Sequence, residues 1–370
     1  MRWTLQQRGF LPTPDPLTEI TGQPMAWIQA LTEDLPELVH EGTFRQESVR
    51  RLNRPFPWEL VEEEDPYGQK EKLFQAYSYF ASAFVHAPGQ EPVTRLPKEI
   101  AIPLATLGEQ LRRPPILAYP SYCLNNWQRI DRQGPIALGN IELVQNFAFP
   151  KEGKRDEDWF ILVHVEIEAR AGTALTAMAE LAQAMAQEDP ATVKSLLVQL
   201  KSGLAAMNKT LDRMPEQCSP DVYFKKVRPY IFGFNDLVYD GCFDDKPVSF
   251  RGETGAQSSI VPAVLSGLGL KHEDSLLTRH LDDMRNYMPV EHREFIESLA
   301  PVRAFAVKHK TSLSEAYNGC LDELLAFRQR HFEYAVNYIH KKVANPLATG
   351  GTPYIPWLNQ LIEETKTGYL

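Results

Sequence analysis

The chain has 370 residues and a formal net charge of −9, with 43% hydrophobic and 24% charged residues. This length can bury the core of two domains or of one large and one small lobe, and the composition is that of an ordinary globular protein. The negative charge excludes a general electrostatic attraction to nucleic acid or to an anionic membrane surface, so we expect neither partner.

The first 115 residues are rich in proline, which divides them into short pieces. Residues 25–40 and 70–85 are the two segments there that predict helices, because their apolar side chains recur at helical spacing. We expect a small helical lobe over residues 1–115 and a linker over 116–135. Only residues 136–149 indicate a strand.

Long helical segments follow, and we expect them to form one large domain over residues 136–370. Residues 156–187 predict a central buried helix, since its first half is apolar almost all round. Pro190 opens an amphipathic helix, and Pro220 opens another that Pro229 ends or kinks. No strands alternate with helices, so the predicted fold class is all-α. Further helices are predicted at residues 274–287, 289–299, 311–343 and 354–367.

The cysteines and the N-terminal residues indicate where in the cell the protein is located. Four scattered cysteines, without a close pair or zinc-type spacing, predict reduced thiols. The N-terminal residues contain no apolar run of signal-peptide length, and no segment reaches about 18 consecutive apolar residues. We therefore expect a cytoplasmic protein.

The predicted helix at residues 311–343 carries a histidine in the middle of its apolar stripe. His331 lies four residues after Phe327 and four before Ala335, where leucine would be expected. One interpretation is a buried histidine that is hydrogen-bonded to a carbonyl group. The other is an axial ligand to a buried metal or haem, because neutral imidazole is the commonest metal-ligating side chain.

A second histidine, His164, lies in the buried helix, one turn before Glu168. It is interpreted either as a structural residue, paired with a carboxylate such as that of Glu168, or as a residue that faces His331 across a cofactor. The remaining histidines are near predicted helix ends or in charged surroundings and are expected on the surface: His40, His86, His272, His280, His292, His309 and His340.

Arg228 lies among aromatic residues in the segment YFKKVRPYIF of residues 223–232. It is interpreted either as an arginine stacked on rings at an interface, or as a planar fork that binds a carboxylate beside an aromatic slot. Two loops are weaker candidates. The amides of RGETGAQSS, residues 251–259, precede a helix and suit a carboxylate, and TGGT at 349–352 is either a hinge or a mobile lid.

Several segments, in the same order, resemble the indoleamine 2,3-dioxygenases, which are haem enzymes related to the tryptophan 2,3-dioxygenases. The most specific is DDMRNYMPVEHREFIESL at residues 282–299, which resembles the family's MR-YMP-HR-FL signature. The resemblance extends from about residue 111 to the C-terminus. The other matching segments are LNNW at 124–127, VRPYIFGF at 227–234, the QSS-type loop at 252–259, SLSEAYN-C at 312–320, RQRHF at 328–332 and TGGT at 349–352.

The resemblance implies a two-lobed helical protein with haem b between the helices of the large lobe and a linker that contributes to the distal pocket. It implies that His331 is the proximal iron ligand, that Arg328 lies near a haem propionate and that Arg228 binds the substrate carboxylate. The residues that match the family's substrate pocket are Tyr223, Phe224, Phe160, Tyr119, Thr254 and Thr349.

Two positions depart from the family pattern. His164 falls at a distal position that the family usually fills with serine, although the tryptophan 2,3-dioxygenases have a distal histidine. Its imidazole is interpreted as a hydrogen-bond partner of the indole nitrogen or of oxygen, as a base, or as a second iron ligand. Glu253 stands where glycine is common and is expected to change the space around the substrate amine.

The resemblance implies a dioxygenase that uses haem and O2 to cleave the indole C2–C3 bond of L-tryptophan or a related indoleamine, with N-formylkynurenine as product. Three alternatives stay open. They are a haem oxygenase of the same superfamily that acts on another indole or aromatic amino acid, a bis-histidine haem sensor or gas carrier, and a helical scaffold without a cofactor. The sequence does not indicate the oligomeric state.

Overall fold

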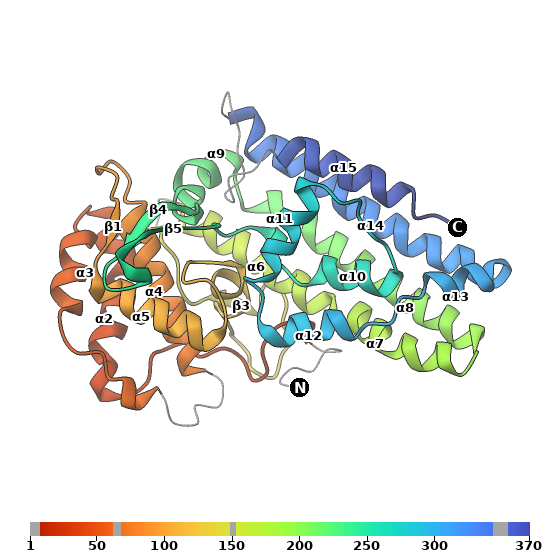
Figure 1. Ribbon diagram of the computed structural model, residues 1–370, viewed down its shortest axis with the longest axis horizontal. Helices are drawn as coiled ribbons and strands as arrows, with labels where there is room; N and C mark the ends of the chain where they lie inside the picture. The colour runs from red at the N-terminus through yellow and green to blue at the C-terminus, as the bar shows by residue number, and fades with distance from the viewer. Residues whose placement is uncertain (1–7, 62–67, 149–152, 343–353) are drawn as a thin grey trace.

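The computed structural model describes residues 8–61, 68–148, 153–342 and 354–370, and the fold is all-α, as predicted (Figure 1). In Figure 1 the helices of the N-terminal part lie at one end of the long axis, and the longest helices lie at the other. Among the described residues, no helix is both long and apolar enough to span a membrane.

Four helices form the N-terminal end of the molecule: α2 (Ala26–His40), α3 (Phe44–Leu52), α4 (Gln69–Val85) and α5 (Lys98–Leu111). The sequence predicted α2 and α4 to within a residue at each end. It missed α3, in which four of nine residues are charged and only Phe44, Ser48 and Leu52 are buried. It also missed α5, because Pro103 lies inside that helix and proline was taken to end helices.

The other end is a bundle in which α8 packs against three other helices, α6, α7 and α14. The helices of this bundle are α6 (Lys154–Arg170), α7 (Gly172–Ala186), α8 (Pro190–Leu211), α14 (Lys310–Tyr338) and α15 (Tyr354–Lys366). The prediction of one helix over 156–187 was wrong. The chain breaks between α6 and α7 at Ala171, where the backbone of Gly9 packs so closely that an added Cβ would lie 2.0 Å from the carbonyl oxygen of Glu168.

Shorter helices cover the bundle, and in Figure 1 α10, α11 and α12 cross the middle of the molecule. Their bounds are α10 (Ile260–Leu268), α11 (Leu276–Arg285), α12 (Val290–Ser298) and α13 (Arg303–Lys308). Before them, Pro220 opens a single turn, α9 (Pro220–Val222), which continues as a π-turn over Tyr223–Val227 and a 3-10 turn over Arg228–Ile231. Pro229 lies in that 3-10 turn, in agreement with the prediction that it ends or kinks the helix opened by Pro220. The helix predicted over 311–343 ends earlier, at Tyr338.

Two small sheets connect parts of the chain that are far apart in sequence. The order of the first is β1-β4-β5, where β1 (Arg95–Leu96) pairs in parallel with β4 (Phe234–Tyr239), and β4 pairs antiparallel with β5 (Pro247–Phe250). The second pairs β2 (Trp127–Arg129) with β3 (Ile141–Leu143). The sequence indicated only the region of β3. The other strands are short, so period-2 alternation could not identify them.

The hydrophobic side chains form two clusters, and α6 contributes to both. Its residues Ile161 and Val165 belong to the cluster around α2, α4 and α5, whereas Val163 and Ile167 belong to the cluster around α7, α8 and α14. Helix α6 therefore lies between the two cores, and its remaining face is directed toward the linker and the turn at Tyr223. That face carries the candidate residues of α6.

Candidate functional site

His331 lies in the C-terminal half of α14, and its imidazole combines an uncovered surface with a pKa that burial lowers. Burial lowers the pKa of His331 to about 4, and the nearby His164 contributes to this shift as a second, smaller cause. The side chain is nevertheless not covered by other protein atoms, because it ranks among the exposed residues. From these two properties together we infer that the ring faces an internal space rather than bulk solvent.

The hydrogen bond to a carbonyl group that a structural histidine would make is not found for His331 in the described part of the chain. Its imidazole is neutral at pH 7, since its pKa is lowered to about 4. One ring nitrogen therefore carries an available lone pair, which is what ligation of a metal requires.

His164 approaches the same space from α6. Its Nδ1 lies 2.7 Å from the carbonyl oxygen of Phe160, and this oxygen can only accept, so Nδ1 carries the proton and Nε2 is the acceptor. Burial lowers the pKa of His164, so the ring is neutral. The proposed pairing of His164 with Glu168 is wrong, because Phe160 provides the hydrogen bond. The structure does bring the two histidines together, since the charge of His164 acts on His331.

The residues around this space fit a haem better than a bare metal ion. Among the described residues, no group of three or more histidine, cysteine, aspartate or glutamate side chains is placed to hold a metal. A haem needs only one or two protein nitrogens, because its porphyrin supplies four others. The imidazole of His331, uncovered and neutral, meets that need.

Phe160 is the centre of an aromatic cluster beside the two histidines. Its ring centroid lies 4.7 Å from that of His164 and 4.8 Å from that of Tyr223. Tyr119 comes from the linker, and its ring meets the His164 ring edge-on at 6.0 Å. Three residues of the pocket implied by the sequence, from α6, the linker and the turn after α9, are therefore neighbours.

Arg228 begins the 3-10 turn that follows Tyr223, and its side chain is buried, with 5% of its surface exposed. Its guanidinium carbon lies 4.5 Å from the ring centroid of Phe232 and 5.5 Å from that of Phe224. The interpretation of Arg228 as an arginine that stacks on aromatic rings is thus confirmed. Burial lowers the pKa of Arg228, which the charges of Tyr223 and Tyr354 partly offset.

The loop of residues 251–259 packs against the Arg228 turn. The backbone amide of Glu253 donates to the carbonyl oxygen of Ile231 at 3.0 Å. Thr254 caps the short turn Gly255–Gln257 with its half-buried side chain. Burial raises the pKa of Glu253 to about 8, and its charge raises the pKa values of Tyr119 and Tyr223. The side chain of Glu253 therefore lies close to the aromatic cluster.

Two buried carboxyl groups of α6 were not identified as functional from the sequence. Glu168 accepts hydrogen bonds from Tyr119 and Ser258, and Glu157 accepts them from Tyr122 and from the amides of residues 147 and 148. Burial raises the pKa of each to about 7. Their spacing from Phe160 and His164 on the helix was the available signal, because it puts all four on one stripe.

Arg328 is buried one turn before His331 and is attached to the C-terminal helix. Its guanidinium donates to the hydroxyl of Thr365 and to the carbonyl oxygen of Leu361 in α15, and it lies 3.4 Å from Nε2 of His272. Burial lowers the pKa of Arg328 to about 10. Thr349, the remaining candidate, lies outside the described residues.

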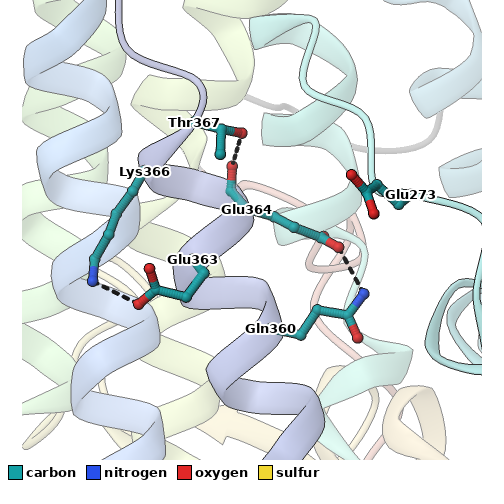
Figure 2. Close-up of a pocket in the computed structure, with 6 residues that line it drawn as sticks. All are labelled: Glu273, Gln360, Glu363, Glu364, Lys366 and Thr367. Carbon is teal, nitrogen blue, oxygen red and sulfur yellow. Dashed lines mark hydrogen bonds and ion pairs between the residues drawn. The ribbon is translucent and has the colours of Figure 1, made fainter.

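A cavity of about 460 Å³ lies against the outer side of α15 and is open to solvent (Figure 2). Its lining is charged and polar, and it contains none of the candidate residues. Gln360 and Glu364 are hydrogen-bonded across one turn of the helix, as are Glu363 and Lys366. Glu364 also accepts from Nδ1 of His272. This cavity therefore adjoins the contact between His272 and Arg328, and its lining contains neither His164 nor His331.

One histidine that was expected on the surface is buried instead. His292, in the segment that carries the family signature, is 4% exposed, stacks on Phe10 at 4.5 Å and lies 3.1 Å from the hydroxyl of Ser259. Burial lowers its pKa to about 3. His292 therefore connects the N-terminal segment to α10 and α12. Its role is structural, and it is not one of the candidate pocket residues.

Comparison with known proteins finds relatives along nearly the whole chain. Residues 2–350 match the protein family described as Indoleamine 2,3-dioxygenase. Indoleamine 2,3-dioxygenase 1 of Rattus norvegicus is 30% identical over 96% of this chain and 92% of its own length. The corresponding protein of Mus musculus is 31% identical over 89% of this chain and 81% of its own. A myoglobin of Haliotis madaka is 27% identical over 97% of this chain and 95% of its own.

Proposed function

The chain belongs to the indoleamine 2,3-dioxygenase family, and we infer from this membership that it is a haem-dependent dioxygenase. It uses O2 to cleave the indole C2–C3 bond of L-tryptophan or a related indoleamine and gives N-formylkynurenine or its analogue. The observation that supports the proposal is that His164, which lies beside an aromatic cluster, is close enough to His331 to lower its pKa, in a fold that also buries Arg228.

We propose haem b as the cofactor, held through the uncovered imidazole of His331. The haem supplies the redox chemistry with O2 when it is bound, and the protein supplies binding, orientation and the exclusion of water. Arg328 fixes α14 to α15 through Thr365 and Leu361, so it keeps the ligand helix in place. It is also our candidate for a contact with a haem propionate.

The substrate is oriented by its carboxylate and by its ring. Arg228 offers a planar pair of N–H donors whose direction is set by Phe232 and Phe224, which suits a carboxylate. The ring of the substrate would lie against Phe160 and Tyr223. The other residues that we propose to contact the substrate are Tyr119, Phe224, Thr254 and Thr349.

His164 is proposed to hold the indole N–H. Because its Nδ1 proton is donated to the carbonyl oxygen of Phe160, only Nε2 is available, and Nε2 can accept a hydrogen bond but not donate one. A neutral imidazole in this tautomer is therefore an acceptor for the substrate nitrogen. The same lone pair is also what a second axial ligand needs.

A gas carrier or sensor is the second candidate, and two observations favour it. The Haliotis madaka relative is a myoglobin by name and matches this chain over nearly its full length. In addition, His164 is close enough to His331 to lower its pKa, which makes His164 a potential second ligand. This function predicts a six-coordinate, low-spin ferrous haem without turnover, whereas the dioxygenase predicts a five-coordinate ferrous haem.

The deciding experiment is the visible absorption spectrum of the haem-reconstituted protein, reduced under nitrogen, before and after L-tryptophan and O2 are added. We expect a five-coordinate ferrous spectrum followed by the absorbance of formylkynurenine. His331→Ala should lose haem, and His164→Ala should keep it, which makes the two variants a matched pair. A low-spin spectrum that tryptophan leaves unchanged, and that His164→Ala converts to five-coordinate, would establish the second candidate instead.

A further inference from the structure

One carboxyl group joins three segments of the wall around the two histidines. The side chain of Glu168 in α6 is 0% exposed. Its Oε1 accepts a hydrogen bond of 2.9 Å from the hydroxyl of Tyr119 in the linker and one of 2.8 Å from the hydroxyl of Ser258 in the loop of residues 251–259. The position of this carboxyl group therefore determines how three segments fit together. They are α6, the linker and the loop of residues 251–259, which we call the substrate loop.

The two oxygens of Glu168 differ in their surroundings. Both donors meet Oε1, whereas Oε2 is buried and has no hydrogen-bond partner among the described residues. A proton on this carboxyl group therefore resides on Oε2. Burial raises the pKa of Glu168 to about 7, so the group changes its protonation near neutral pH.

The titratable groups that face Glu168 come from the linker. Its charge raises the pKa values of Tyr119 and Cys123, and the charge of Glu253 in the substrate loop acts on the same two groups. On α6 itself, His164 lies one turn before Glu168, and its proton is committed to Phe160. Among these neighbours His164 is the potential second iron ligand of the alternative function, and Glu168 is hydrogen-bonded to Tyr119 and Ser258 and not to His164.

Tyr119 is held at two points, and both matter for its ring. Its backbone amide donates to Oε1 of Gln257 at 3.0 Å, and its hydroxyl donates to Glu168. The ring between these two points meets the imidazole of His164 edge-on. Loss of the hydroxyl contact would leave only the backbone anchor, and the ring could then turn away from His164.

We propose that Glu168 is a positioning residue of the substrate pocket, which fixes the Tyr119 ring against His164 and ties the 251–259 loop to α6 through Ser258. The inference rests on the proposed function, because it concerns the same pocket. Glu168 acts through its two partners and contacts neither substrate nor iron. Its loss should therefore weaken substrate binding more than it slows the chemical step.

Glu157 provides a matched control on the same helix. It is also fully buried, it accepts a hydrogen bond of 3.3 Å from the hydroxyl of Tyr122, and burial raises its pKa to about 7 as well. Both of its oxygens, however, also accept from backbone amides, at residues 147 and 148. Its substitution removes a buried carboxyl group without releasing the Tyr119 ring or the substrate loop.

The test compares Glu168→Gln, Tyr119→Phe and Ser258→Ala with Glu157→Gln in the haem-reconstituted full chain. The dissociation constant of L-tryptophan is measured from the shift of the Soret band, together with kcat and KM, between pH 6 and pH 8. We expect each of the first three variants to weaken binding about 5- to 30-fold, less than the loss of a direct hydrogen bond between a charged group and the substrate, with kcat within about twofold. Glu157→Gln should bind as the wild type does.

The pH profile separates positioning from a merely structural role. An ionised carboxylate accepts the two hydroxyl donors more strongly than a neutral acid does, so wild-type affinity should rise as the pH passes about 7. Glu168→Gln cannot ionise at this position and should lose the rise centred near pH 7, whereas Glu253, whose pKa burial raises to about 8, titrates in both proteins. Thermal unfolding of every variant shows whether it folds. If Glu168→Gln does not fold, Tyr119→Phe tests the same hydrogen bond.

The outcomes distinguish this inference from the proposed function. Wild-type binding of L-tryptophan without turnover would refute the dioxygenase, whereas the comparison of dissociation constants would still test the positioning role. Wild-type affinity in Tyr119→Phe and Ser258→Ala, or an equal loss in Glu157→Gln, would overturn the role of Glu168. A wild-type pH profile that Glu168→Gln reproduces would overturn it too.

Discussion

Replacement of Arg228 by alanine tests how the pocket recognises its substrate. The guanidinium is buried and lies 4.5 Å from the ring of Phe232 and 5.5 Å from that of Phe224, so its plane is fixed before a ligand arrives. A bidentate contact with a carboxylate contributes about 1.5–3 kcal/mol. Arg228→Ala should therefore raise the KM for L-tryptophan about tenfold to a hundredfold.

The assay uses two substrates and one conservative variant. Tryptamine lacks the carboxylate, so Arg228→Ala should change its KM less than about threefold. Arg228→Lys keeps the charge but loses the planar fork, and its KM for L-tryptophan should lie between those of the wild type and the alanine variant. Product absorbance gives both constants. Equal losses with tryptamine and L-tryptophan would refute the carboxylate contact and leave ring stacking as the role of Arg228.

Three further predictions follow from the same geometry. His164→Ser removes the Nε2 acceptor and should raise the KM for L-tryptophan more than that for 1-methyl-L-tryptophan, which has no indole N–H; equal changes would contradict the proposed hydrogen bond. Gly9→Ala should lower the melting temperature in calorimetry, because its φ of +56° is left-handed and the new Cβ would lie 2.0 Å from the carbonyl oxygen of Glu168. An unchanged melting temperature would show that the segment can move away. Because burial raises the pKa values of Glu157 and Glu168 from 4.5 to about 7, the folded protein holds protons that the unfolded chain releases. Each of the two groups should thus lower the free energy of unfolding by about 3 kcal/mol between about pH 4.5 and pH 7, while His331 and His292, whose pKa values burial lowers to about 4 and about 3, contribute with the opposite sign. Urea unfolding of the wild type and of Glu157→Gln isolates the contribution of one carboxyl group, and equal pH slopes in the two proteins would refute the assignment.

The sequence predicted the elements whose signal is local. Helices α2, α4, α8 and α15 were found because each carries an apolar stripe or a clear start and end, such as Asp189 and Pro190 at α8. The break between α6 and α7 could not be predicted, since it depends on the approach of Gly9 from the other end of the chain. The same holds for β1 and β4, whose pairing partners are about 140 residues apart in the sequence.

The residues of the candidate site also divide into those with a local sequence signal and those that depend on distant contacts. His331 and Arg228 were identifiable because each interrupts a pattern, one as an imidazole in an apolar stripe and the other as a cation among aromatic residues. The tautomer of His164 was not predictable, because the carbonyl group that fixes it is chosen by the ring's rotamer. The role of Glu168 was also missed, since its partners Tyr119 and Ser258 come from segments that only the fold brings together.

Helix α6 has the sequence of a buried core helix, and one of its faces also lines the proposed substrate pocket. Glu157, Phe160, His164 and Glu168 recur at intervals of three and four residues, so they share a face, whereas the residues between them fill the two hydrophobic clusters. Two buried carboxyl groups and an imidazole on one face cost stability, because each loses its hydration. Tyrosine hydroxyls, a serine and backbone amides offset part of that cost. An apolar residue in place of Glu168 would make a more stable helix but would leave the ring of Tyr119 and the loop of residues 251–259 without their common anchor, which is why we locate the control of substrate binding at Glu168 and not at Glu157.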